Sequence, residues 1–175
     1  YNHLARQGAQ QLLIDLRDAA IGTFEAGIAA AELFTEADPL VIRESSNAQE
    51  PVARSDRRLS VTWPVVLITN PGTAGAAELF AAALTDTTHA ESVGVRTAGR
   101  AAEQTLVRLP DGGGLLLSST RFLTASGASI HRVGVEPTVT VEEPAVELTR
   151  TPPVAPQDDP LLDRALEHLV DMTIP

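Results

Sequence analysis

The chain has 175 residues but contains no cysteine and no lysine. Without cysteine it can form no disulfide, no thiolate metal site and no cysteine nucleophile. All 13 basic residues are arginine, whose guanidinium stays protonated in proteins. Every mechanism that needs a neutral lysine amine within this chain is therefore excluded.

Long apolar runs and clustered positive charge are also missing. No apolar stretch approaches the roughly 18 residues of a membrane-spanning helix, and no signal peptide opens the sequence. The net charge of −10 argues against a nucleic-acid partner, because binding to phosphates needs clustered Lys and Arg. With 43% hydrophobic and 21% charged residues, the composition is that of a folded globular domain. Because Tyr1 is not an initiating residue, we expect the chain to be part of a longer protein.

The first half of the chain shows the patterns of alternating strands and helices. Apolar runs predict strands over residues 11–17, 39–44 and 65–69, and helical spacing predicts a helix over 23–34. The polar, unpatterned residues 45–58 predict a loop.

The second half adds a hairpin to this pattern. We expect a helix over residues 73–86, a strand over 92–95 and extended chain over 133–141. Between them, residues 104–124 predict a β-hairpin that turns at Asp111–Gly113, where glycine tolerates positive φ. Strands that alternate with helices and are followed by a hairpin indicate an α/β domain with a mixed β-sheet and flanking helices.

The end of the chain predicts a linker and a helix. We expect a core domain over residues 1–144, a Pro-rich linker over 145–158 and an amphipathic helix within 159–175 that packs on the core. Asp159 is the expected N-cap, followed by a proline in the first turn. The apolar stripe of this helix comprises Leu161, Leu162, Ala165, Leu166, Leu169 and Val170.

Common catalytic and ligand-binding motifs are missing. The histidines are scattered and have no metal-ligand spacing. The glycine-rich segment 70–75 lacks the lysine of a phosphate-binding loop, and there is no Gly-x-Ser-x-Gly turn. We therefore expect no bound metal and no cofactor.

Four segments, in order, resemble the carboxy-terminal processing (tail-specific) serine peptidase family. They are "GAQQLLIDLRDAAIG" (8–22), "VVLITNPGTAGAAELFAAAL" (65–84), the stretch 92–141 with its hairpin, and "DPLLDRALEHL" (159–169). The resemblance implies a crotonase/Clp-protease-like peptidase core. It also implies a periplasmic or other cell-envelope location and the presence of a peptide-binding PDZ-type module upstream.

The resemblance places substitutions at the catalytic positions. The family uses a Ser-Lys dyad assisted by Gln. Gly75 falls where the nucleophilic serine belongs, Arg100 aligns with the general-base lysine, and only Gln104 matches. Glycine cannot form an acyl-enzyme, and arginine cannot accept the proton. The resemblance therefore predicts that the catalytic dyad is not intact.

The same alignment predicts a peptide-binding surface beside the former nucleophile. Ile21 replaces a glycine near the expected oxyanion-hole amide, and Arg100 is a fixed cation suited either to a peptide carboxylate or to an internal salt bridge. The expected binding residues are Gly22, Ile21, Gly72, Thr73, Ala76 and Arg100.

These residues support three hypotheses. The first is an inactive peptidase-family domain that binds peptide or protein termini, or acts as a scaffold. The second is a carrier of a small apolar ligand, held by Ala19, Ala20, Ile21, Gly75 and Ala77. The third is an active serine peptidase that uses another nucleophile, such as Thr73, Ser118 or Ser119. The sequence leaves the oligomeric state open.

Overall fold

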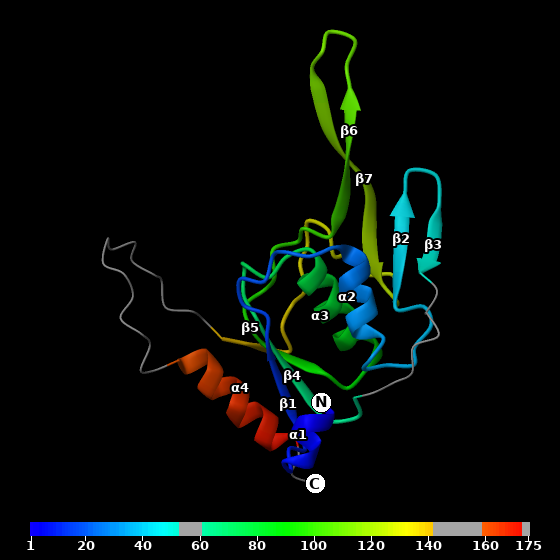
Figure 1. The fold of residues 1–175 in the computed structure, drawn as a ribbon. Helices are drawn as coiled ribbons and strands as arrows, with labels where there is room; N and C mark the ends of the chain where they lie inside the picture. The colour runs from blue at the N-terminus through cyan, green and yellow to red at the C-terminus, as the bar shows by residue number, and fades with distance from the viewer. Residues whose placement is uncertain (53–60, 142–158, 173–175) are drawn as a thin grey trace, which may run out of the picture.

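The computed structural model describes residues 1–52, 61–141 and 159–172. The strands form one parallel and one antiparallel sheet, and helices lie on both faces of the parallel sheet (Figure 1). The predicted α/β domain with flanking helices is confirmed, although its strands divide between two sheets. Within the described ranges, no helix is long and apolar enough to cross a membrane.

The parallel sheet forms the centre of the domain. Its strands, in spatial order, are β1 (Leu12–Asp15), β4 (Val65–Thr69), β5 (Glu91–Gly94) and β8 (Val139–Thr140). Every residue of β4 is buried, because this continuous apolar run packs on both faces of the sheet. The prediction of a central strand over 65–69 is confirmed.

The described helices are α1 (Asn2–Arg6), α2 (Phe24–Ala31), α3 (Ala76–Thr87) and α4 (Pro160–Asp171). The last three make the parallel sheet the middle layer of three. Helices α2 and α3 pack together on one face of the parallel sheet, and α4 packs on the other (Figure 1).

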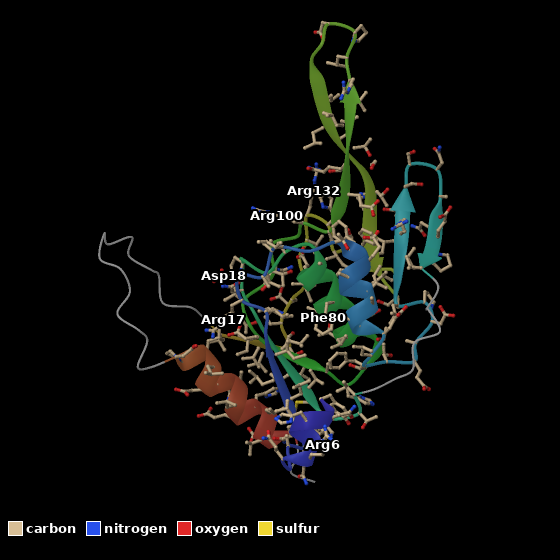
Figure 2. The ribbon with its side chains drawn as sticks, viewed as in Figure 1. Arg6, Arg17, Asp18, Phe80, Arg100 and Arg132 are labelled. Carbon is tan, nitrogen blue, oxygen red and sulfur yellow. The ribbon has the colours of Figure 1, made fainter. Side chains whose placement is uncertain are left out.

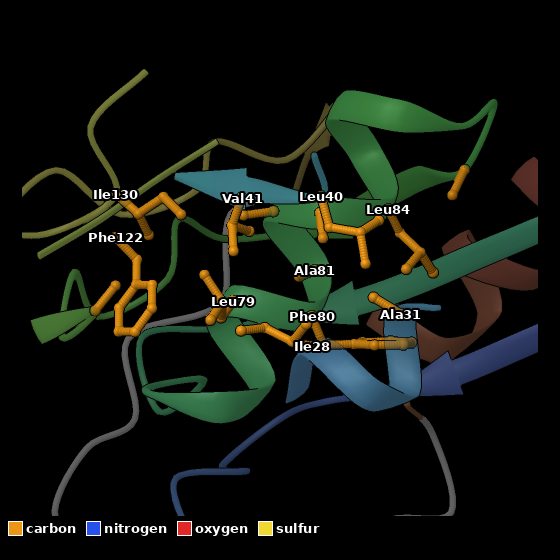
Figure 3. Close-up of a cluster of buried hydrophobic side chains, with 14 of the residues drawn as sticks. Ile28, Ala31, Leu40, Val41, Leu79, Phe80, Ala81, Leu84, Phe122 and Ile130 are labelled. Carbon is orange, nitrogen blue, oxygen red and sulfur yellow. The ribbon is translucent and has the colours of Figure 1, made fainter. Parts of the chain in front are cut away.

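Alternation along β4 divides the core between the two faces. Val65 and Leu67 belong to the cluster under α2 and α3, whereas Val66 and Ile68 pack against α4. Figure 3 shows the larger cluster, which joins α2 and α3 to the antiparallel sheet. Its labelled members include Ile28, Leu40, Val41, Leu79, Phe80, Phe122 and Ile130.

The antiparallel sheet carries a long hairpin. Its strands, in order, are β3 (Gln49–Val52), β2 (Val41–Ser45), β7 (Gly114–Thr124) and β6 (Ala102–Arg108). The β6–β7 hairpin extends away from the body of the domain (Figure 1). This confirms the predicted hairpin, whose turn is closed by a 2.9 Å hydrogen bond from the Gly113 N–H to Asp111 Oδ1.

The prediction of a loop over residues 45–58 is wrong in its first part. Residues 49–52 form β3, which pairs antiparallel with β2 from Val41↔Val52 to Glu44↔Gln49. Most of β3 is exposed, so it carries no apolar alternation, and its Pro51 is acceptable because β3 lies at the edge of the sheet. Residues 53–58 and the predicted linker 145–158 lie outside the described residues.

Helix α4 begins at the expected residue, but fewer of its apolar side chains are buried than expected. Asp159 is its N-cap, accepting a hydrogen bond from the Leu162 N–H, and proline occupies the first turn. Leu161, Ala165 and Leu169 are buried, whereas the predicted stripe residues Leu166 and Val170 are 46% and 56% exposed. The contact with the sheet is therefore narrower than the stripe.

An arginine connects this helix to the end of β1. The Arg17 guanidinium donates to Asp159 at 3.0 and 2.8 Å and to Asp15 at distances down to 2.6 Å. The hydrogen bonds from Arg17, together with the backbone N–H of Leu162, lower the pKa of Asp159. Because the folded-state pKa lies below the unfolded value near 3.8, this carboxylate stabilises the fold above that pH. Its contribution is lost as the pH falls through the folded-state pKa.

Replacing Asp159 with asparagine tests this ion pair, since asparagine retains the N-cap and removes only the charge. We expect Asp159→Asn to lower the free energy of unfolding at pH 7 by about 1 kcal/mol. The difference from the parent should shrink as the pH falls below about 4. Urea unfolding between pH 7 and pH 2 measures both effects. The exposed Asp171 provides the control, Asp171→Asn; equal behaviour of the two variants would contradict the assignment.

Candidate functional site

The turn between β4 and α3 is held against the segment that follows β1. Asn70 Oδ1 accepts hydrogen bonds from the Gly72 N–H at 2.9 Å and the Asp18 N–H at 3.1 Å. The Asn70 amide donates back to Asp18 Oδ1 at 3.2 Å. A Cβ atom at position 72 would collide with Asp18, so glycine is required there. Two of the four segments that carry the family resemblance, 8–22 and 65–84, thus form one hydrogen-bonded unit.

Gly75 lies where this turn becomes a helix. Its φ and ψ of 60° and −119° lie in a region that L-residues rarely occupy, and it is the N-cap of α3. The helix begins at Ala76, three residues after the start of the predicted range 73–86, and Gly75 lies just before it. No atom lies within 4 Å of the position where a Cβ would stand. A side chain at 75 would have room but would strain the backbone.

Small residues allow α3 to lie close to its neighbours. A Cβ at Gly27 of α2 would overlap the backbone carbonyl of Ala76. A Cβ at Gly22 would lie 3.2 Å from the Ala76 Cβ. The first turn of α3 therefore packs between the loop before α2 and α2 itself.

Glu78, in that first turn, holds the loop that precedes β6. Its side chain is fully buried and accepts hydrogen bonds from the Thr97 hydroxyl, from the Gly99 N–H at 2.6 Å and from the Arg100 N–H at 2.7 Å. The Ala98 N–H donates to the Thr73 carbonyl at 3.0 Å. A buried carboxylate with several donors is strongly held. It fixes the backbone of Arg100 beside the turn that carries Gly75.

The side chain of Arg100 takes no part in the contacts that hold the described residues together. It is exposed and lies at the base of the hairpin, near Arg132 (Figure 2). In the described part of the chain its guanidinium makes no hydrogen bond and no ion pair. Of the two roles expected for Arg100, the internal salt bridge is therefore not found there.

Gln104 lies further along the hairpin. It is exposed on β6 and pairs with Ser118 of β7, next to a bulge in the ladder. Its position on β6 places it in the strand that follows directly from the Arg100 loop. Gly75, Arg100 and Gln104 thus lie on three connected elements: the start of α3, the loop pinned to α3, and β6.

Thr73 and Ile21, two of the expected binding residues, differ in their burial. Thr73 is fully buried; its hydroxyl donates to the Leu16 carbonyl at 2.8 Å and accepts from the Asn70 N–H at 3.1 Å. Its side chain is therefore structural and is not available as a nucleophile or as a ligand contact. Ile21, in contrast, is 100% exposed, so it lines no enclosed cavity.

A cavity that the sequence did not predict lies where β2 ends beside β7. It has a volume of about 310 Å³ and is lined in part by Ser118, Ser119, His131 and Arg132. Among the described residues, the imidazole makes no hydrogen bond with either serine. In the same ranges, no group of three or more His, Asp or Glu side chains is arranged to hold a metal ion.

The comparisons with known proteins identify the family. The model of peptidase family S41 matches residues 1–141, so the chain belongs to this family. It is 34% identical over 142 residues to the carboxy-terminal processing protease CtpA of Bacillus subtilis, covering 81% of this chain and 30% of that protein. It is 32% identical over 143 residues to a chloroplastic C-terminal processing peptidase of Tetradesmus obliquus, covering 81% of this chain and 31% of that one.

Solved structures agree with this assignment. The photosystem II D1 C-terminal processing protease matches with a TM-score of 0.70 and 33% identity over 80% of this chain and 36% of its own. A lipoprotein from Streptococcus agalactiae shares the fold, with a TM-score of 0.69 and 18% identity over 98% of this chain and 58% of its own. The chain spans about a third of the length of the curated relatives named above.

The buried carboxylate of Glu78 yields a prediction about stability. Replacing it with glutamine leaves one acceptor oxygen and turns an N–H₂ group toward donors, so Glu78→Gln should lower the free energy of unfolding by about 2–4 kcal/mol. Urea unfolding at neutral pH measures this change. The exposed Glu36 supplies the control, and Glu36→Gln should change stability by less than about 0.5 kcal/mol. A small loss in Glu78→Gln would show that the carboxylate does not hold the loop.

Proposed function

We propose that this chain is a catalytically inactive member of the S41 family that binds the carboxyl termini of peptides or proteins. The observation that carries the proposal is the turn at Gly75, which has the positive-φ backbone and open space suited to a nucleophile but no side chain. The backbone of Arg100 is fixed beside this turn, and the family resemblance aligns Arg100 with the lysine base.

The chemistry of these two positions supports inactivity. Glycine offers no group to form an acyl-enzyme. Arginine remains protonated and has no acceptor, so it cannot act as the general base. In a comparable catalytic unit, loss of the nucleophile or the base alone costs on the order of 10⁶ in rate.

Arg100 supports a role in binding. Its guanidinium is exposed and unpaired in the described part of the chain, and it can contact a carboxylate through two parallel hydrogen bonds. Helix α3 has no side-chain cap, so its N-terminal N–H groups and dipole add positive potential near Gly75. A carboxyl terminus bound between Arg100 and the start of α3 would interact favourably with both.

The other two hypotheses are less well supported. The full exposure of Ile21 argues against an enclosed apolar ligand site at this surface. The buried, hydrogen-bonded state of Thr73 argues against its use as a substitute nucleophile. A scaffold role is the form of this proposal in which the bound partner is a folded protein and not a peptide. A PDZ-type module upstream and a periplasmic or cell-envelope location complete the proposal by analogy with the family.

Peptide binding tests the proposed role of Arg100. We expect an unstructured peptide with apolar C-terminal residues to bind as the free acid, and about tenfold more weakly as the C-terminal amide. Arg100→Gln should remove this difference, whereas Arg164→Gln, on the exposed surface of α4, should keep it. Fluorescence anisotropy with a labelled peptide measures the affinity of the parent protein and of both variants. Equal affinity of acid and amide for the parent protein would contradict carboxylate recognition.

Restoring the dyad tests inactivity. The parent should not react with a fluorophosphonate probe and should leave a tail peptide uncut. Gly75→Ser with Arg100→Lys supplies both missing groups, yet we expect weak hydrolysis, because Ile21 replaces glycine near the oxyanion donor, which is worth roughly 10²–10³ in rate. The nearby carboxylate of Glu78 also favours a charged lysine.

The variant Ile21→Gly separates the effect of Ile21 on hydrolysis from the effect of Glu78. It should raise hydrolysis in the double variant and change nothing in the parent. Brisk cleavage by the double variant alone would show that only the dyad differs from an active enzyme. Stoichiometric labelling of the parent would overturn the proposal of inactivity.

A further inference from the structure

We propose that the cavity between β2, β7 and the segment 131–132 binds the carboxylate of a small polar molecule. This cavity has a volume of about 310 Å³, near the lower end of the roughly 300–1,000 Å³ typical of small-molecule sites. Gly75 and Arg100 do not line it, so the inference is separate from the proposed peptide site.

Arg132 supplies the uncompensated positive charge. Its φ of 63° places it in the left-handed region, which is unusual for a residue with a side chain, and its N–H donates to the Gly99 carbonyl at 2.8 Å. Within the described ranges its guanidinium makes no ion pair. Arg132 is one of the residues that line the cavity, and it lies at the base of the hairpin (Figure 2).

A second arginine in the cavity is already neutralised. Arg121 forms an ion pair with Glu44 at 2.7 Å, and these two residues lie opposite each other in the pairing of β2 with β7. The pair contributes no net charge, so the cavity carries about one positive charge from Arg132. A monoanion matches this charge, whereas a dianionic phosphate would exceed it.

His131 lines the same cavity with an imidazole. Burial, together with the charges of Arg132 and Arg121, lowers the pKa of His131, while Glu78 acts in the opposite direction. The lowered pKa favours the neutral imidazole. The Nδ1 atom is buried out of reach of solvent and makes no hydrogen bond within the described part of the chain. A ligand in the cavity would therefore use the other ring nitrogen of His131.

Serine hydroxyls complete the set of polar groups. Ser46 and Ser118 line the cavity, and neither side chain has a hydrogen-bond partner among the described residues. A cation, an imidazole and free hydroxyls around one cavity favour a carboxylate that carries further polar groups.

Acetate is the simplest probe of this site. We expect millimolar acetate to shift the ring resonances of His131 in a saturable way, identified by their absence in His131→Gln, and to leave those of the exposed His89 unchanged. A bound anion should also raise the pKa of His131, so acetate should bind more tightly as the pH falls toward 6. The titration is run at constant ionic strength, with chloride as the balancing salt.

Arg132→Asn is the decisive variant, because asparagine tolerates positive φ while lacking the guanidinium. It should weaken acetate binding about tenfold or more. Ser118→Ala should weaken it less and serves as a second variant on β7. The matched control is Arg108→Gln, which removes an exposed arginine on the hairpin outside the cavity and should change nothing.

Four results would overturn the proposal. Three concern the cavity itself. They are the absence of a saturable shift at His131, an unchanged affinity in Arg132→Asn, and tighter binding of inorganic phosphate than of acetate at equal ionic strength. Loss of acetate binding in Arg100→Gln, with Arg132→Asn unaffected, would place the carboxylate at the peptide site instead. That last result would overturn this inference and leave the proposed function standing.

Discussion

The arrangement of the site depends on one buried carboxylate. Glu78 lies in the first turn of α3, where the helix dipole already favours a negative charge. From there it accepts hydrogen bonds from Thr97, Gly99 and Arg100, so a single side chain joins the start of α3 to the loop before β6. Because this charge is fully buried, the loop can move away only by exposing or unpairing it, which is expensive. The distance between the Gly75 turn and Arg100 is thus set by Glu78 and not by the exposed residues themselves.

Much of the fold could be predicted from the sequence because its elements carry strong local signals. The run at 65–69 is apolar throughout, and the turn at Asp111–Gly113 has a specific glycine requirement, so both were recognised. Strand β3 was missed because an exposed edge strand has no apolar period to detect. The exposure of Leu166 and Val170 could not be foreseen either, since the width of an apolar stripe does not reveal how much of it meets a partner.

The residues of the candidate site also divide into those that could be predicted from the sequence and those that could not. Gly75, Arg100 and Gln104 were found through continuous segments that resemble the family, whereas the cavity at Arg132 joins residues from β2, β7 and the segment 131–132. No spacing in the sequence connects these segments; only the pairing of β2 with β7 brings them together. The backbone role of Glu78 was missed for a related reason, because an acidic residue in a helix's first turn is ordinary in sequence. Its burial is a tertiary property.

The backbone at Gly75 bears on how an S41 domain can tolerate the loss of catalysis. A serine with a φ of 60° and a ψ of −119° would carry strain of roughly 1–3 kcal/mol, which an active enzyme accepts in order to present its nucleophile. Glycine adopts the same conformation without that strain. On the proposed function, the substitution therefore removes the acyl-forming group and relieves the backbone at the same position. The hydrogen bonds of Asn70 and Glu78 do not involve the side chain at 75, so the turn and the placement of Arg100 persist without it. On the proposed function, what remains is a rigid turn beside a permanent cation, an arrangement suited to holding a chain terminus without cutting it.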